Sequence, residues 1–241
     1  MILIVGASSG LGFSLANRFK NTGKIFLVSR KKIKIKNPNF VKINIDINGN
    51  NLNKLFNKIK KKKLRYIFFT VGYADWNNDN LNINKENAEK IIRTNFLSIT
   101  NITNELIRRK KMDKNCLICF CSSVSTILPR HRQIFYCSSK SALNSYAKSL
   151  EFTNKLDNLN FQVVNLMLGY IETKMNKNIS TPLKKMSPNY VADFIYKNRK
   201  NLNGTIFLPR YWVIIKMLIA LIPKNLLVGL IKVIFSKRKF F

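Results

Sequence analysis

The chain has 241 residues, 46% of them hydrophobic, so it can bury one substantial core and is too apolar for a disordered protein. It carries 43 lysines and arginines against 11 aspartates and glutamates, a formal net charge of +32, which favours anionic partners. The charge is dispersed and no recognition motif accompanies it, so we expect no nucleic-acid partner. An AT-rich coding sequence is a second explanation of the lysine excess, and both explanations stay open.

Apolar runs of strand length alternate with longer segments of helical period as far as residue 209. This alternation is typical of a parallel sheet with helices on both faces. We predict strands at Ile2–Val5, Lys24–Ser29, Phe40–Ile45, Tyr66–Thr70, Asn115–Cys121, Phe161–Met167 and Thr205–Leu208. We predict helices at 10–21, 52–61, 85–109, 136–155 and 188–199. The predicted fold class is therefore α/β, a doubly wound Rossmann-type sheet in three α/β/α layers, formed by residues 1–209 as one domain.

The C-terminal tail, residues 210–241, departs from this alternation. Its apolar run is interrupted by polar residues at Lys216, Pro223-Lys224-Asn225 and Lys232. Charges and a proline in mid-segment argue against a membrane-spanning helix. We predict two short helices on an anionic membrane surface through residues 211–241, with Tyr211 and Trp212 at headgroup level and the basic end 237–239 facing lipid. Packing on the domain or at a subunit interface is the alternative.

Cysteine usage and the first residues bear on the compartment. Cys116, Cys119 and Cys121 lie in one predicted strand, where Cys116 and Cys119 face opposite sides and share neither a disulfide nor a metal. We predict buried free thiols, as in a reducing cytoplasm, and no metal site. The segment Met1–Gly6 has no basic region before its apolar residues, so we expect no signal peptide and a cytoplasmic protein.

A glycine-rich segment, Gly6-Ala7-Ser8-Ser9-Gly10-Leu11-Gly12, follows the first predicted strand and opens the first helix. In this context glycines permit a tight turn and bring a pyrophosphate close to the N–H groups of a helix N-terminus. The segment predicts a dinucleotide site with the contacts Gly6, Ser8, Ser9, Gly10, Leu11 and Gly12.

The end of the second predicted strand indicates which dinucleotide is bound. NAD sites usually place an acid there for the ribose 2′-hydroxyl, whereas this chain has Ser29 and Arg30 and no acid nearby. Arg30 is suited to clamp a 2′-phosphate, and Ser29 can add a hydrogen bond. The sequence therefore predicts NADP(H).

Tyr136 and Lys140 are four residues apart and share one face of a predicted helix. A free phenol has a pKa near ~10, and a cation beside it favours the phenolate. We expect Lys140 to lower the pKa of Tyr136 toward the range of efficient acid–base catalysis. Such a pair is common on solvated helices, so its meaning depends on the other motifs.

Those motifs occur in an order that resembles the short-chain dehydrogenase/reductase family over about residues 1–209. They are Gly6-x-x-x-Gly10-x-Gly12, Arg93-Thr94-Asn95-Phe96, Cys121-Ser122-Ser123-Val124, Tyr136-x-x-x-Lys140 and Gly169-Tyr170-Ile171-Glu172-Thr173. Two positions depart from the family pattern. Thr70-Val71-Gly72 stands where the family has Asn-Ala-Gly, and Leu168 stands where a proline usually precedes Gly169, which puts details of the cofactor pocket in doubt.

The resemblance implies a role for each catalytic residue. Ser123 would donate a hydrogen bond to the substrate carbonyl oxygen, and Tyr136 would protonate that oxygen during reduction. Lys140 would lower the pKa of Tyr136 and hold the nicotinamide ribose. Asn95 would hold a water that links Lys140 to solvent.

The resemblance also implies further cofactor contacts. Asp46 would lie near the adenine, Gly72 would shape the pocket, and Gly169, Ile171 and Thr173 would contact the nicotinamide. The family commonly forms homo-oligomers through two long helices, here 85–109 and 136–155. His131 is expected in the loop near the pocket mouth.

We therefore expect an NADPH-dependent reductase that interconverts a ketone and a secondary alcohol. The apolar tail suggests a lipid-like or lipid-linked substrate and peripheral attachment at the inner face of the membrane. Two alternatives stay open. One is a soluble 3-oxoacyl reductase with its tail at a subunit interface, and the other is a non-catalytic, membrane-associated nucleotide-binding scaffold.

Overall fold

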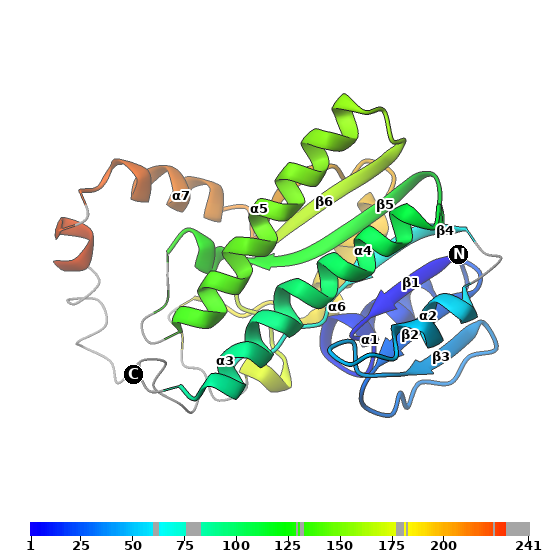
Figure 1. Ribbon diagram of the computed structural model, residues 1–241. Helices are drawn as coiled ribbons and strands as arrows, with labels where there is room; N and C mark the ends of the chain where they lie inside the picture. Colours follow the sequence, from blue (N-terminus) through cyan, green and yellow to red (C-terminus); the bar gives the residue numbers. More distant parts are fainter. Residues whose placement is uncertain are drawn as a thin grey trace.

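The computed structural model describes residues 1–59, 63–75, 83–128, 130, 133–176, 181, 183–223 and 225–229. Within these residues, seven strands form one sheet in the order β3-β2-β1-β4-β5-β6-β7, and every pairing is parallel (Figure 1). The strands are β1 (Ile2–Val5), β2 (Ile25–Ser29), β3 (Phe40–Asn44), β4 (Leu64–Phe69), β5 (Met112–Ser123), β6 (Phe161–Leu168) and β7 (Gly204–Leu208). The predicted doubly wound parallel sheet is confirmed.

Helices cover both faces of the sheet, and the sheet separates two apolar clusters. Buried side chains of α1 (Gly10–Phe19) and α6 (Pro188–Asn198) pack in one apolar cluster with β1, β2 and β6. Side chains of α2 (Leu52–Lys58), α4 (Ser98–Arg108) and α5 (Ile134–Leu156) pack in a second cluster on the opposite face. The central strands are buried on both faces, which is why they read as continuous apolar runs. The end that we predicted for α2, at Lys61, lies outside the described residues.

The strand order reverses between β1 and β4, since β2 and β3 lie on one side of β1 and the later strands lie on the other. In a doubly wound sheet such a switch point opens a crevice at the carboxyl ends of the strands. Ser29 ends β2 and Ser123 ends β5, and the glycine-rich turn leaves the same end of β1. The topology thus brings the predicted functional segments to one edge of the sheet.

The helix predicted at 85–109 is interrupted in its middle. It consists of α3 (Lys85–Ile92), a π-helical turn at Arg93–Leu97 and α4. A π-turn inserts an extra residue into a helix and is common at functional sites. Here it carries Asn95, whose side chain is fully buried.

The tail begins with α7 (Trp212–Leu221), which runs away from the sheet at the left of Figure 1. Residues 225–229 are helical as well, in agreement with two short helices. Our expectation for Trp212 was wrong. Its side chain is 5% exposed, because its indole packs against Gly169. No helix in the described parts of the chain is both long and apolar enough to cross a bilayer. The basic end 237–239 lies outside those parts.

Candidate active site

A pocket of about 530 Å³ opens at the carboxyl ends of the strands. Every predicted site residue lines it except Gly12 and Asn95, which lie behind the lining residues. The predicted residues that line it are Gly6, Ser8, Ser9, Gly10, Leu11, Ser29, Arg30, Asp46, Gly72, Ser123, Tyr136, Lys140, Gly169, Ile171 and Thr173. Seven separate segments of the sequence therefore form one site.

The glycine-rich turn requires glycine for steric reasons. Gly6 has φ +98°, and a Cβ there would lie 2.6 Å from the backbone nitrogen of Val71. A Cβ on Gly12 would collide with the carbonyl of Gly6, so the helix could not start so close to β1. Ser9 is the N-cap of α1 but makes no side-chain cap, and the first turn contains no acidic residue. The helix N-terminus thus presents uncapped N–H groups to the pocket, as phosphate sites do.

The loop after β6 closes the pocket opposite this turn. A Cβ on Gly10 would lie 3.2 Å from the methyl carbon of Thr173, so the two segments are in contact. A Cβ on Gly72 would approach the Asn95 amide oxygen at 3.7 Å and the Lys140 ammonium at 3.8 Å. Gly72 therefore lies close to both Asn95 and Lys140.

Thr70, which stands where the family pattern has asparagine, links two strand ends through its hydroxyl. Its hydroxyl donates to the carbonyl of Val5 at 2.9 Å and joins the ends of β4 and β1. This bond holds the two strand ends between which the glycine turn lies. Gly72, the residue of Thr70-Val71-Gly72 that matches the family pattern, lines the pocket.

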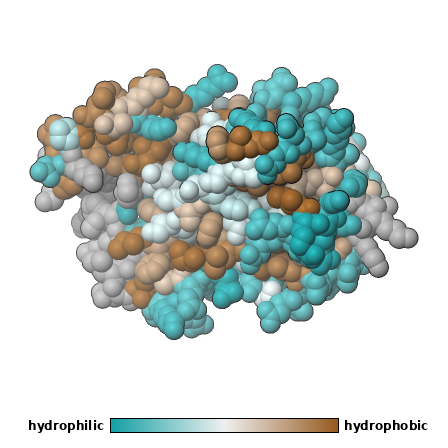
Figure 2. All heavy atoms as spheres, turned by 45° about the horizontal axis from the view of Figure 1, so that its top comes forward, coloured by the Kyte–Doolittle hydropathy of each residue, from teal (hydrophilic) through white to brown (hydrophobic). Residues whose placement is uncertain are grey.

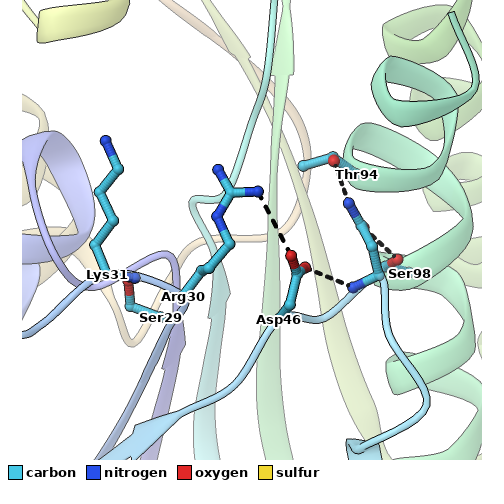
Figure 3. A network of polar contacts seen from close by, with 7 residues as sticks. Ser29, Arg30, Lys31, Asp46, Thr94 and Ser98 are labelled. Carbon is cyan, nitrogen blue, oxygen red and sulfur yellow. Dashed lines mark hydrogen bonds and ion pairs between the residues drawn. The ribbon is translucent and has the colours of Figure 1, made fainter. Parts of the chain in front are cut away.

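Arg30 lies beside Asp46 at the mouth of the pocket (Figure 3). Its guanidinium is 3.5 Å from the carboxylate, and the two side chains are 55% and 43% exposed. An exposed ion pair of this length contributes little free energy, about 0–1 kcal/mol. Arg30 can therefore exchange this partner for an incoming phosphate at small cost. The Ser29 hydroxyl accepts a hydrogen bond from the Lys31 backbone N–H at 3.1 Å.

Asp46 is held by a polar network that the sequence did not reveal (Figure 3). Its second carboxylate oxygen accepts from the Asn48 backbone N–H at 3.0 Å. The Asn48 side chain donates to the Thr94 hydroxyl at 2.7 Å and accepts from the Ser98 hydroxyl at 2.9 Å. This network connects the end of β3 with the helix that carries Asn95.

Tyr136 has a raised pKa, contrary to our expectation. Burial is the largest cause, because it penalises the phenolate. A hydrogen bond with Ser123 and the positive charge of Arg130 act in the lowering direction. Lys140 is not among these causes, although its ammonium lies 6.0 Å from the centre of the Tyr136 ring. Ser123 is therefore the direct partner of Tyr136, and both belong to one polar unit.

Lys140 is 4% exposed, although it carries an ammonium group. Its Nζ donates to the carbonyl of Cys121 at 2.8 Å, which compensates part of the cost of burial. Burial lowers its pKa to about 8, while the nearby Cys121 thiol acts in the opposite direction. The group can consequently release a proton more readily than an exposed lysine.

Asn95 lies behind the pocket and links two of the segments that form it. Its amide nitrogen donates to the carbonyl of Tyr73 at 2.8 Å and to the Ser139 hydroxyl at 3.0 Å. Its amide oxygen accepts from the Tyr73 N–H at 2.7 Å. The side chain thus joins the segment after β4 to α5, which carries Tyr136 and Lys140. The water-holding role implied by the resemblance stays a prediction.

Arg130 is a site residue that sequence reasoning missed. Its guanidinium lies 5.0 Å from the centre of the Tyr170 ring, and its backbone N–H donates to the Cys137 thiol at 3.3 Å. The available signal was a basic residue six positions before Tyr136, which is too general to single out. His131 lies outside the described residues.

The four cysteines lie in the core. All four are buried free thiols, as we predicted. No group of histidine, cysteine or acidic side chains in the described ranges is placed to hold a metal ion. Burial raises the pKa of Cys116 to about 12, so this thiol is unreactive at neutral pH.

Comparison with known families gives a match that covers most of the chain. A family model described as short chain dehydrogenase matches residues 1–184. No curated protein matches the sequence.

Solved structures share the fold at low sequence identity. A short chain dehydrogenase from Burkholderia cenocepacia in complex with NADP aligns with a TM-score of 0.78 and 18% identity, over 95% of this chain and 96% of that chain. A short chain dehydrogenase family protein from Francisella tularensis gives 0.77 and 18%, over 88% and 98%. The 3-ketoacyl-(acyl-carrier-protein) reductase from Brucella melitensis, complexed with NADH, gives 0.73 and 20%, over 87% and 97%.

Proposed function

This chain belongs to the short-chain dehydrogenase family, and we propose that it is an NADPH-dependent reductase that converts a ketone to a secondary alcohol. Membership places it among the oxidoreductases that interconvert C=O and CH–OH with a nicotinamide dinucleotide. The choice of NADPH, the reducing direction and the roles of the side chains are our proposal.

The observation that carries the proposal is the meeting of Ser123, Tyr136 and Lys140 with the glycine turn in one pocket. When bound, NADPH supplies the hydride. Ser123 and Tyr136 share a hydrogen bond, so a carbonyl oxygen placed between them can accept from both hydroxyls. The raised pKa of Tyr136 keeps its proton in place at neutral pH, as a general acid requires.

Lys140 follows Tyr136 in the proposed proton path. Its ammonium is buried and its pKa is lowered to about 8. It can therefore return a proton toward the Tyr136 hydroxyl after turnover. Asn95 positions this helix through Ser139 and the backbone of Tyr73. We keep the role of a water relay at Asn95 as part of the proposal.

The pocket fits NADPH at three points. Uncapped N–H groups at the start of α1 would hold the pyrophosphate, and glycines leave room for its approach. Arg30, supported by Ser29, would hold the 2′-phosphate, while Asp46 would lie near the adenosine. Gly169, Ile171 and Thr173 would contact the nicotinamide.

The substrate is proposed to be a lipid-like or lipid-linked ketone, because the tail exposes apolar side chains next to the site. Within this proposal the protein is cytoplasmic, attaches peripherally to the inner face of the membrane and forms a homo-oligomer. A soluble 3-oxoacyl reductase is the second candidate. It is favoured by the likeness to a 3-ketoacyl-(acyl-carrier-protein) reductase, which has the same fold.

The test is NADPH oxidation in the presence of a panel of ketones that includes short soluble ones, long-chain ones and 3-oxoacyl thioesters. Tyr136→Phe keeps the ring and removes the proton, so we expect its rate to fall by about 10²–10⁴-fold with NADPH binding retained. Reduction of the 3-oxo group of the thioesters, and of no other ketone in the panel, would favour the second candidate. NADPH binding without reduction of any ketone would support a non-catalytic scaffold and contradict the proposal.

A further inference from the structure

Helix α7 exposes an apolar surface that the rest of the fold does not cover. Nine of its ten residues are apolar, and Lys216 is the exception. Beyond Trp212 no side chain of this helix is buried, and Ile214, Met217, Leu218 and Leu221 are 62%, 62%, 55% and 81% exposed. The helix projects from the body in Figure 1 and forms the brown cluster at the upper left of Figure 2. A helix that is apolar on all sides is normally buried in protein or lipid.

The apolar surface continues past the end of α7. Leu226 and Val228, in the helical residues 225–229, are 56% and 52% exposed. Ten residues of helix measure only about 15 Å, half the thickness of the hydrocarbon core of a bilayer, so α7 is too short to span it. A short apolar helix of this kind fits the interface between headgroups and acyl chains.

The charge of this region favours lipid over a second copy of the chain. From residue 204 to the end the sequence has seven lysines and arginines and no aspartate or glutamate. Two copies that met through α7 would bring together two such segments, in a protein with a net charge of +32. An anionic bilayer instead supplies the opposite charge at its surface and apolar chains beneath it.

We propose that α7 and residues 225–229 form a docking surface for the anionic face of a lipid bilayer. Trp212 fixes the start of this surface to the catalytic body, because its indole packs against Gly169, which lines the pocket. Docking therefore brings the Gly169 end of the pocket close to the lipid. The consequence that a membrane-resident ketone enters from this side rests on the proposed reductase activity, whereas docking itself does not.

The test is flotation of the full-length protein with vesicles of phosphatidylcholine, either pure or mixed with phosphatidylglycerol. We expect flotation with the mixed vesicles, several-fold weaker flotation with pure phosphatidylcholine and release by high salt. The double variant Leu218→Glu/Leu221→Glu should reduce flotation about tenfold or more, because it places two anions where the apolar chains would lie. Trp212 stays unchanged in this variant, since it belongs to the packed body.

A matched control applies the same chemical change elsewhere. Leu159 and Tyr190 are 42% and 55% exposed and lie outside α7 and outside the helices expected at the subunit interface, so Leu159→Glu/Tyr190→Glu adds two anions at exposed apolar positions elsewhere. This control should float like the wild type. Equal loss in both variants would mean that net charge alone drives binding and would overturn the proposal. Absence of flotation, with light scattering that shows a dimer broken by the α7 variant, would identify a second copy as the occupant.

Activity measurements separate this inference from the proposed function. Reduction of a short soluble ketone should be the same in the α7 variant and the wild type, because the pocket is untouched. Reduction of a long-chain ketone embedded in vesicles should fall in the α7 variant in parallel with flotation. Flotation without any ketone reduction would contradict the proposed function and leave the docking surface standing.

Discussion

The carboxyl edge of the sheet and helix α7 touch each other through Gly169 and Trp212, yet they are built in opposite ways. At the sheet edge each side chain has a specific partner, such as the Cys121 carbonyl for Lys140 and the Tyr73 backbone for Asn95. In α7 the side chains beyond Trp212, apart from Lys216, are apolar, and none of them is buried. Residue identity should therefore matter at the sheet edge, whereas polarity alone should matter in α7.

The largest effect is expected at the glycine turn. Gly6→Ala places a Cβ 2.6 Å from the Val71 backbone nitrogen at φ +98°, so we expect the free energy of unfolding to fall by about 3 kcal/mol or more. Gly23→Ala is the matched control, since Gly23 has φ +114° but nothing within 4 Å. It should lose only about 1 kcal/mol, the cost of the backbone conformation. Chemical denaturation measures both, and equal losses would refute the close-packing argument.

A smaller effect is expected at the cofactor end of the pocket. Arg30→Gln removes a charge-assisted bond to the 2′-phosphate, so the KM for NADPH should rise about 10–100-fold while the KM for NADH stays the same. Lys31→Gln, at the neighbouring pocket position, should change the KM for NADPH much less. Steady-state kinetics with both cofactors provide the measurement. An Arg30 variant that loses NADH and NADPH equally would rule out 2′-phosphate recognition.

The pH dependence of stability should reveal the buried ammonium of Lys140. Its pKa is about 8 in the folded protein and about 10.5 in the unfolded chain, so the unfolded state binds more protons between these values. Burial therefore costs stability below pH 8, and this cost disappears as the pH rises toward 10.5.

The variant Lys140→Met isolates this contribution, because methionine has similar length and no charge. The wild type should gain stability relative to the variant as the pH rises through this window. Denaturation curves of both proteins at several pH values give the difference in their free energies of unfolding. The buried tyrosines and thiols have an opposite pH effect, but it is the same in both proteins and cancels in this difference. A constant difference would show that Lys140 does not have the lowered pKa.

The smallest effect is expected in α7. Exchanging one apolar residue for another there, as in Ile214→Leu/Leu218→Ile, should change the free energy of unfolding by less than about 0.5 kcal/mol, because both positions are largely exposed. Vesicle flotation should also stay the same. A large loss of stability would mean that α7 packs with specific partners, and the contrast with the sheet edge would break down.

Much of the fold could be predicted because central strands buried on both faces leave long apolar runs in the sequence. The glycine turn was equally readable, since its glycines follow a strand and precede a helix. The π-turn at Arg93–Leu97 could not be predicted, because it depends on the hydrogen bonds of the Asn95 side chain with Tyr73 and Ser139. Such tertiary contacts leave no period in the sequence.

The chemistry of the site was predicted in its residues but not in its electrostatics. Spacing placed Lys140 next to Tyr136 on one helix face, whereas the structure directs the ammonium to the Cys121 carbonyl and gives Tyr136 the partner Ser123. Trp212 was misplaced for a related reason. An aromatic residue at the start of an apolar helix suits a membrane interface and a protein core equally well, and only its contact with Gly169 decides between them.

The central claim is that this pocket transfers hydride from NADPH to a ketone whose oxygen is protonated by Tyr136. The most direct measurement uses NADPH deuterated at the transferred position of the nicotinamide and analyses the alcohol product by mass spectrometry. We expect one deuterium on the carbinol carbon with the wild type and loss of product with Tyr136→Phe. Product without deuterium, or equal labelled product from both proteins, would contradict the central claim.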